Sequence, residues 1–219
     1  MRTFIISDIH GNNELFRKSL KQIGLKKTDK LLLLGDLIDR GPDSKGVLDT
    51  IILLLESGFN IECLIGNHEK MLLDASLNTN NLNLWVINGG DKTLSSFLTS
   101  SIEKIPLKYY ELLNSFKYFL EMDNFIFVHA ALNMKIENPY TDTETILWER
   151  DPFKYLNIEW LGNRKLIHGH NPKSQEFILK SIENDEKIIC VDNGTYLNKK
   201  NYGTLCVLEL ENLKLNFFK

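Results

Sequence analysis

Cysteine is scarce in this sequence of 219 residues, which contains only three. The number is odd, no two cysteines form a CxxC pair, and no zinc-ribbon spacing occurs, so the pattern argues against a disulfide framework and against a structural zinc site. Each cysteine lies in an apolar, strand-like run, at Cys63, Cys190 and Cys206. We expect core thiols in a reducing compartment.

An excess of charge of one sign is also absent. The chain has 26 lysine and arginine residues against 29 aspartate and glutamate residues, which gives a net charge of -3 at pH 7. This balance argues against a surface that binds duplex nucleic acid or an anionic membrane. A negatively charged substrate would have to be held by local charges or by a metal ion.

Long hydrophobic runs are missing as well. No apolar stretch reaches the length of a membrane span. The first residues, MRTFIISDIHG, already read as a strand and leave no room for a secretion leader, so we expect a soluble cytoplasmic protein. With 43% hydrophobic residues, the chain can bury a sizeable core in one large domain or two small ones.

Three strand-like runs each end in a cluster of polar residues. The runs at 4–7, 31–34 and 60–65 lead into DIHG, GDLIDRG and GNHE, respectively. The run LLLL at 31–34 is typical of a strand buried on both faces. Helical patterns at 12–23 and 44–57 separate the three runs, so the order is strand, helix, strand, helix, strand.

The spacing of these clusters fits repeated βαβ units. Asp8 and Asp36 are 28 residues apart, and Asp36 and Asn67 are 31 apart, each the length of one unit. Because such units are parallel and right-handed, all three clusters should meet at the carboxyl edge of one sheet, where open α/β sheets bind ligands. The sequence therefore predicts an α/β fold with a site at this edge.

The rest of the chain supplies helices and then further strands. Residues 70–122 predict a helical insertion that covers the site, including a helix opened by Pro106 whose apolar face runs to Leu120. No linker flanks the insertion, so we expect a single domain over residues 1–219. Later strand-like runs predict a second, mixed sheet packed on the first, at 125–128, 165–167, 187–191 and 205–210.

Histidine is informative because the chain has only five, and four of them directly follow a strand, beside a glycine or another small residue. The five are His10, His68, His129, His168 and His170. With Asp8, Asp36 and Asn67 they make a mixed ligand set without thiolates, which suits manganese, iron or zinc at a catalytic site. Asp36, at the centre of the set, can bridge two ions.

Five motifs in order resemble those of one enzyme superfamily. DIHG at 8–11, GDLIDRG at 35–41, GNHE at 66–69, VHA at 128–130 and HGH at 168–170 look like the calcineurin-like metallophosphoesterases, specifically their phosphoprotein phosphatase branch. The connecting segments RGPDSKGVLD, WVINGG, LWERDPF and GHNP resemble those of bacterial and bacteriophage serine/threonine phosphatases. The resemblance spans nearly the whole chain. It implies a four-layer α/β/β/α sandwich of two mixed sheets, with a dimetal site at the C-terminal edges of the strands.

The resemblance also implies roles for individual residues. Two divalent metal ions, manganese first and iron or zinc as alternatives, would be bound by Asp8 and His10, by Asn67, His129 and His170, and by Asp36 as the bridge. A hydroxide bridging the ions would attack phosphorus in line. His68 would protonate the leaving oxygen as general acid, oriented by Asp39. Arg40 and Arg150 would clamp the phosphate with parallel donors.

Two further polar residues near the motifs receive no catalytic role. His168 reads as an ordinary strand residue, and Asp192 reads as a turn residue that supports the site. Two positions depart from the family pattern, since Ala131 stands where relatives often carry glycine and Asn193 makes the turn DNG where many read DTG. We expect slightly different loop geometry near the second metal, with no ligand lost.

The substrate remains open between two phosphoesters. A serine/threonine protein phosphatase is favoured by Asp39 and Glu69, because the diadenosine tetraphosphatase branch typically has a small residue at the first position and aspartate at the second. A dinucleoside polyphosphate or nucleotide hydrolase is the alternative. A non-catalytic metal-binding interaction module would be a third class, but it would need the replacement of a ligand or of His68. The sequence indicates neither the oligomeric state nor regulatory partners.

Overall fold

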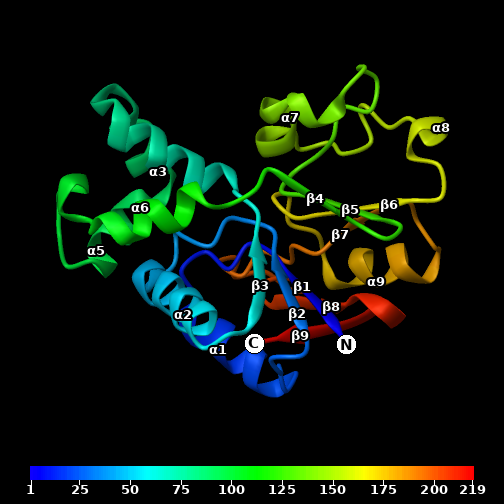
Figure 1. Ribbon diagram of the computed structural model, residues 1–219, viewed down its shortest axis with the longest axis horizontal. Coiled ribbons are helices and arrows are strands. Elements are labelled where there is room, and N and C mark those ends of the chain that lie inside the picture. Colours follow the sequence, from blue (N-terminus) through cyan, green and yellow to red (C-terminus); the bar gives the residue numbers. More distant parts are fainter.

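Two β-sheets packed face to face form the centre of the structure, a computed structural model that describes residues 1–219 (Figure 1). The first sheet has the strand order β3-β2-β1-β8-β9. Its strands are β1 (Thr3–Ile6), β2 (Lys30–Leu33), β3 (Asn60–Cys63), β8 (Leu205–Glu209) and β9 (Lys214–Phe218). β1, β2 and β3 are parallel, whereas β8 and β9 are antiparallel to their neighbours.

The second sheet has the strand order β4-β5-β6-β7. Its strands are β4 (Phe119–Met122), β5 (Phe125–Val128), β6 (Lys165–His168) and β7 (Ile188–Cys190). β5, β6 and β7 are parallel, and β4 is an antiparallel edge strand. Both sheets are therefore mixed, which confirms the predicted α/β class with two mixed sheets.

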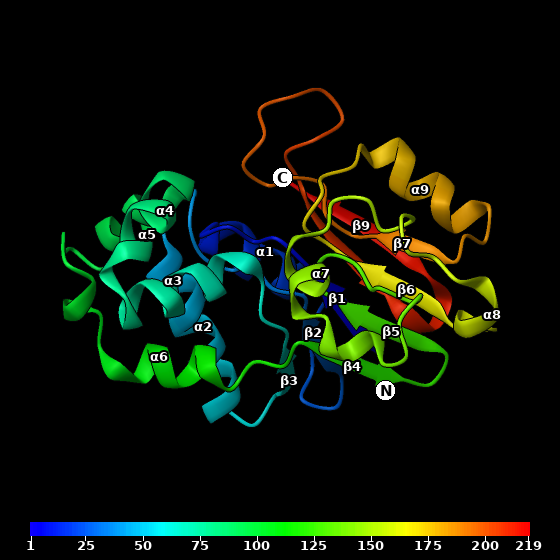
Figure 2. The same cartoon turned by 90° about the horizontal axis from the view of Figure 1, so that it is seen from above.

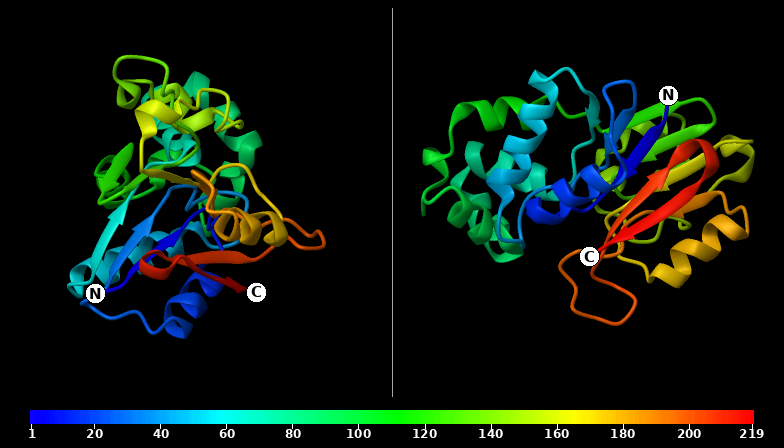
Figure 3. Two further views of the ribbon diagram at one scale, coloured as in Figure 1. Left: turned by 90° about the vertical axis from the view of Figure 1, so that its right-hand side faces the viewer. Right: turned by 90° about the horizontal axis from the view of Figure 1, so that it is seen from below.

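Helices cover the outer faces of the two sheets and complete four layers (Figures 1 and 3). The first sheet is covered by α1 (Asn13–Gln22) and α2 (Ser44–Glu56), and the second by α7 (Thr143–Trp148) and α8 (Ile158–Leu161). α9 (Gln175–Glu183) lies beside β7. The predicted sandwich is confirmed, although α7, α8, α9 and β9 were not among the predicted elements.

The four leucines at 31–34, in β2 and directly after it, contribute to two apolar clusters. Leu31 and Leu33 pack toward α1 and α2, in the larger apolar cluster. Leu32 and Leu34 point the other way and pack between the sheets. Because successive side chains of a strand point to opposite faces, a strand with a packed layer on each side reads as a continuous apolar run. The predicted burial of this strand on both faces is confirmed.

A helical lobe extends to one side of the sheets (Figure 2). It consists of α3 (Asn67–Leu77), α4 (Leu82–Trp85), a π-helical turn (Val86–Gly90), α5 (Asp91–Ser96) and α6 (Leu107–Asn114). Trp85 is fully buried in it and belongs to the same apolar cluster as β1 and β2. The lobe therefore shares its core with the first sheet.

The predicted helix that runs to Leu120 is wrong at its C-terminal end. α6 ends at Asn114, and residues 119–122 form β4. β4 pairs with β5 because the chain reverses tightly at Asp123, whose φ is 52°. Leu120 packs against the cluster between the sheets. Tertiary strand pairing has thus outweighed the helical spacing of the apolar residues.

The scarce cysteines are all free and buried, at Cys63, Cys190 and Cys206, as predicted for core thiols. None of the helices combines the length and the apolar character that crossing a bilayer requires.

Candidate metal centre

The loops that follow β1, β2 and β3 meet at one end of the first sheet. The backbone ladder continues beyond β1 and β2, since the amide of Asp8 donates to the carbonyl of Gly35 (3.1 Å). The amide of His10 likewise donates to the carbonyl of Asp36 (2.9 Å). The start of α3, which follows β3, joins them because the amide of His68 donates to Oδ1 of Asp36 (3.1 Å). The three polar clusters therefore lie together at the carboxyl edge, as the spacing predicted.

The backbone at this edge is strained. Six of the eleven non-glycine residues with positive φ are predicted site residues. They are Asp8, His10, Asp36, Asp39, Arg40 and His170, with φ from 46° to 68°. Each such conformation costs roughly 1–3 kcal/mol and persists only where the surroundings enforce it, which is common at functional sites.

Asp36 lies between two groups of potential metal ligands. The ligand atoms of each group lie within 4.8 Å of one another, in the groups His10, Asp36, His68 and Asp36, His129, His170. Oδ2 of Asp36 is 3.6 Å from Nε2 of His10, whereas Oδ1 is 3.3 Å from Nε2 of His129. The two carboxylate oxygens face different groups, which is the geometry of a bridging ligand.

Asn67 belongs with the second group. Its Oδ1 lies 3.0 Å from Nε2 of His129 and 3.0 Å from Nδ1 of His170, and these two nitrogens are 3.2 Å apart. Transition metals bind such ligands at about 2.0–2.2 Å, so the ligands of one ion lie roughly 3 Å from each other. Asp8 is adjacent, because its Oδ2 accepts from the amide of His170 (3.0 Å).

Backbone carbonyls orient two of the histidines. Nδ1 of His10 lies 3.1 Å from the carbonyl oxygen of Ile38, and Nδ1 of His129 lies 2.8 Å from that of Leu34. A carbonyl only accepts hydrogen bonds, so each ring carries its proton on Nδ1 and turns the lone pair of Nε2 toward Asp36. Metal-binding histidines are commonly held in this way.

The centre is short of positive charge. Asp8, Asp36 and Asp192 are each 1% exposed, and Oδ2 of Asp192 has no hydrogen-bond partner. Burial, with repulsion from Asp36, raises the pKa of Asp8 to about 6, and burial also raises the pKa of Asp36 and Asp192. Burial lowers the pKa of His10 and His129. Buried carboxyl groups beside neutral imidazoles fit divalent cations, which would supply the missing charge.

His68 lies beside this centre but has a partner of its own. Its Nδ1 lies 2.8 Å from Oδ2 of Asp39, and its Nε2 has no hydrogen-bond partner. Asp39 also accepts from Nε1 of Trp85 (2.9 Å) and from the hydroxyl of Thr93 (2.6 Å), both in the helical lobe. Burial lowers the pKa of His68 to about 4 and raises that of Asp39 to about 7. The lobe thus holds the partner of His68.

Two arginines lie around the same centre. Nη1 of Arg40 is 2.8 Å from Nε2 of His10, and the amide of Arg40 donates to the carbonyl of Gly89 (3.2 Å). Arg150 has an exposed side chain. Burial lowers the pKa of His68, and the positive charges of Arg40 and Arg150 lower it further. The structure therefore places Arg40 in contact with a predicted ligand, whereas Arg150 lies within electrostatic range of the predicted acid.

Glu69 has a role that the sequence patterns did not indicate. Its carboxylate accepts from the amides of Asp36 (2.9 Å), Leu37 (2.8 Å) and Gly66 (2.9 Å), and so ties the loop after β2 to the start of α3. Only glycine fits at Gly66, since a Cβ there would lie 2.3 Å from the amide nitrogen of Asp36. The available signal was a glutamate three residues after Gly66, which is the spacing of a capping box.

Three other residues lie near the two ligand groups without belonging to them. Nδ1 of His168 is 2.9 Å from the carbonyl oxygen of Gly169. Asp192 accepts from the amide of Gly194 (2.7 Å) within its own turn. Tyr196 lies against Arg40, and no motif in the sequence marked it.

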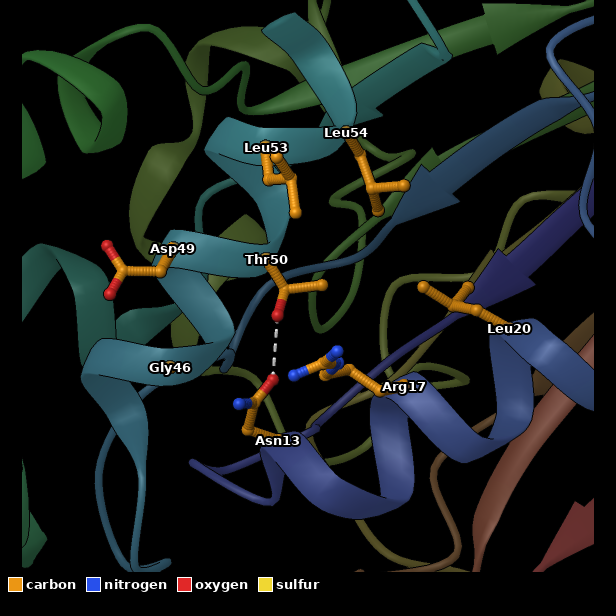
Figure 4. Close-up of a pocket in the computed structure, with 8 residues that line it drawn as sticks. All are labelled: Asn13, Arg17, Leu20, Gly46, Asp49, Thr50, Leu53 and Leu54. Atoms are coloured by element: carbon orange, nitrogen blue, oxygen red, sulfur yellow. Dashed lines mark hydrogen bonds between the residues drawn. The ribbon is translucent and has the colours of Figure 1, made fainter. Parts of the chain in front are cut away.

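A cavity of about 430 Å³ between α1 and α2 contains none of the predicted site residues (Figure 4). Three of the four polar side chains that line it, those of Asn13, Asp49 and Thr50, are hydrogen-bonded. The hydroxyl of Thr50 donates to Oδ1 of Asn13 (2.8 Å), whose Nδ2 donates to Asp43 (2.9 Å). Asp49 accepts from the hydroxyl of Tyr109 (2.7 Å). We assign no function to this cavity.

Comparisons with solved structures support the fold. A cold-active protein tyrosine phosphatase aligns with a TM-score of 0.69 at 18% identity, over 99% of this chain and 78% of that one. A protein serine/threonine phosphatase from Saccharomyces cerevisiae aligns with a TM-score of 0.67 at 15% identity, over 100% of this chain and 80% of that one. At such low identity these likenesses show the shared fold alone.

Comparisons with known sequences identify the family. A segment of 89 residues is 43% identical to serine/threonine-protein phosphatase 1 of Salmonella typhimurium, over 40% of this chain and 38% of that protein. A segment of 169 residues is 31% identical to symmetrical bis(5'-nucleosyl)-tetraphosphatase of Nitrosomonas europaea, over 74% of this chain and 58% of that protein. The matches thus span less than two thirds of these relatives. Because residues 1–208 match the calcineurin-like phosphoesterase family, this chain belongs to that family.

Proposed function

We propose that this protein is a metal-dependent phosphoester hydrolase that acts as a serine/threonine protein phosphatase. The proposal rests on one observation, the position of Asp36 between two groups of buried ligands. We further propose that residues 1–219 form a single domain, with the helical lobe as an insertion that supports the site. Manganese is our first choice of metal, with iron and zinc as alternatives, because all three accept this ligand set.

In this proposal the two ions share one carboxylate. The first ion would be held by Asp8, His10 and Asp36, and the second by Asp36, Asn67, His129 and His170. When bound, two such ions act as Lewis acids toward a phosphoryl group and make a water molecule acidic enough to serve as nucleophile at neutral pH.

His68 would act as the general acid. Its Nδ1 is engaged by Asp39 and its Nε2 is unpartnered, so Nε2 is the atom available to protonate a leaving oxygen. Burial keeps the imidazole neutral in the absence of a substrate, with a pKa of about 4. A phosphate dianion beside Nε2 would favour the charged form and raise this pKa, which would supply the proton where the ester bond breaks.

Arg40 and Arg150 would bind the phosphate. A guanidinium presents two parallel donors to the oxygens of a phosphate and keeps its charge at any working pH. The buried carboxyl groups repel an anionic substrate, so cationic groups at the rim are needed to offset that repulsion.

For the leaving group, we propose the side chain of a phosphoserine or phosphothreonine. Asp39 and Glu69 favour a protein phosphatase, as does the segment that is 43% identical to the Salmonella typhimurium phosphatase. The alternative, hydrolysis of a dinucleoside polyphosphate, is favoured by the longer match to the Nitrosomonas europaea tetraphosphatase. A non-catalytic metal-binding module would retain the ligands but hydrolyse neither.

The hydrolytic function can be tested with phenyl phosphate, an aryl phosphate whose leaving oxygen needs a proton. Protein loaded with Mn²⁺ should release phosphate and should lose this activity when the metal is chelated. His68→Asn should lose most of the rate while binding the same amount of Mn²⁺, and His168→Asn is the matched control outside the proposed ligand set. Full activity of His68→Asn would refute the acid assignment, and inactive metal-loaded protein would favour the non-catalytic module.

The substrate can be tested by direct competition of the two classes. A single preparation is assayed for phosphate release from a phosphothreonine peptide and for cleavage of diadenosine tetraphosphate, at equal concentrations. We expect a higher kcat/KM for the peptide. A strong preference for the dinucleotide would overturn our first choice in favour of the alternative.

A further inference from the structure

Tyr196 contacts the proposed site, yet none of the proposed roles uses it. The Cζ atom of Arg40 lies 4.5 Å from the centroid of the Tyr196 ring, within the range of a cation–π interaction. The imidazole of His10 packs against the ring edge to face, with 4.9 Å between the centroids. The tyrosine is 41% exposed. Its ring therefore lies at the boundary between the buried ligands and solvent.

The loop that carries Tyr196 is anchored at its base. This loop, residues 191–204, projects from the sandwich between β7 and β8 (Figures 2 and 3). Asn193 is buried and closes it, because its Nδ2 donates to the carbonyl of Asn201 (3.0 Å) and its Oδ1 accepts from the hydroxyl of Thr204 (2.6 Å). The asparagine of the unusual DNG turn thus fixes the loop.

A second anchor lies directly beside Tyr196. The hydroxyl of Thr195 donates to the backbone carbonyl of Asp8 (2.8 Å), in the first of the three site loops. The position of the Tyr196 ring is therefore coupled to the loop that also carries His10. A projecting loop that is anchored on both sides of Tyr196 is suited to hold that residue in one place.

The other side-chain contact of Arg40 competes with the proposed metal. Nη1 of Arg40 lies 2.8 Å from Nε2 of His10, whose lone pair is also the proposed metal-binding group. One lone pair cannot serve a guanidinium proton and a metal ion together. If His10 binds a metal, the ring of Tyr196 remains as the side-chain contact that the structure gives to the guanidinium.

We propose that Tyr196 is a positioning residue that holds the guanidinium of Arg40 at the rim of the site, ready to bind phosphate. This inference rests on the proposed role of Arg40 as a phosphate ligand. The ring provides the contact and the hydroxyl is dispensable. The effect should be the same for every phosphoester, because Tyr196 acts through Arg40 and not on the organic group.

The test measures the dissociation constant of inorganic phosphate from Mn²⁺-loaded protein by calorimetry, without turnover. Tyr196→Leu should raise this constant by about three- to tenfold, the range of a cation–π contact at a partly exposed site. Tyr196→Phe should stay within about twofold of the wild type, since it keeps the ring. Tyr202→Leu, in the same loop, is the matched control and should have no effect. A Tyr196→Phe variant as weak as Tyr196→Leu would overturn the proposal.

A double-mutant cycle separates action through Arg40 from a direct contact. In the Arg40→Ala background, Tyr196→Leu should weaken phosphate binding no further. Additive losses would overturn the proposal, because the ring would then act on the phosphate itself or through His10, which it also contacts. A loss of kcat/KM confined to aromatic esters would likewise overturn it, because the ring would then touch the organic group. If the wild type binds phosphate but hydrolyses no ester, the proposed function fails, while the binding series still decides the role of Tyr196.

Discussion

Nδ1 of His68 lies 2.8 Å from Oδ2 of Asp39, in a pair of side chains that solvent does not reach. Asp39 lies in the loop after β2, whereas His68 is the second residue of α3, and Asp39 is also held by Trp85 and Thr93 of the helical lobe. The lobe therefore carries the proposed acid and also fixes the carboxylate that orients it.

Replacing the carboxylate of Asp39 should slow the hydrolysis of esters with poor leaving groups most. Asp39→Asn can present its amide to Nδ1 and favour the wrong tautomer of His68, so we expect kcat on a phosphothreonine peptide to fall by about 10²–10⁴-fold. Cleavage of 4-nitrophenyl phosphate should fall much less, because its leaving group needs no proton. Glu111→Gln, an exposed acid on α6 outside this network, is the control. Equal losses on both substrates would contradict the acid role of the pair.

Replacing Glu69 by glutamine should loosen two site loops together. Glu69→Gln loses acceptor capacity toward the amides of Asp36, Leu37 and Gly66, and each such hydrogen bond contributes about 0.5–1.5 kcal/mol. We expect urea denaturation to give a free energy of unfolding lower by about 3 kcal/mol, with weaker Mn²⁺ binding in calorimetry. Glu56→Gln, at the exposed end of α2, should change neither. A Glu69→Gln variant as stable as this control would show that the amides find other partners.

Metal titration should distinguish the shared ligand from an unshared one. Asp36 faces both ligand groups, so Asp36→Ala should weaken the binding of both Mn²⁺ ions. His170 belongs to one group, so His170→Ala should weaken one ion and leave the other near its wild-type affinity. Calorimetry under identical conditions measures both affinities. If Asp36→Ala lost only one ion, the bridging assignment would be wrong.

The stability of the metal-free protein should depend on pH through His168. Burial lowers the pKa of this imidazole to about 4, whereas an unfolded histidine titrates near 6.5. The stability that the neutral imidazole contributes is fully present above the pKa of the unfolded state. It is lost as the pH falls from about 6.5 toward 4. Between pH 6.5 and 5 the wild type should lose about 1.6 kcal/mol more than His168→Gln. Urea unfolding of both proteins across this range provides the check, and parallel pH profiles would contradict it.

Much of the fold could be predicted because its signals are local. The apolar runs at 4–7, 31–34 and 60–65 lie within two residues of β1, β2 and β3. A strand buried on both faces needs apolar side chains at every position, so it appears in the sequence as a continuous apolar run. A glycine or polar residue after the run marks where the strand ends. The resemblance to metallophosphoesterases was equally readable, because its motifs stand directly after strands, and the family match confirms it.

Other features depended on partners far away in the sequence. Residues 119–122 have helical spacing but form β4, because β5 offers them a strand to pair with. Glu69 and Tyr196 act through amides and a guanidinium that only the folded chain brings within reach. No local pattern encodes such contacts.

The sequence by itself determined the order of the first three strands and the two helices between them, the residue types at the strand ends and the family. Only the tertiary structure decided how those side chains face one another. Six predicted site residues have positive φ, a conformation that L-residues adopt at a cost when surrounding contacts enforce it. The carboxylate of Asp36 faces two ligand groups because the packed loops hold its backbone in this conformation. The same packing brings the ring of Tyr196 against Arg40.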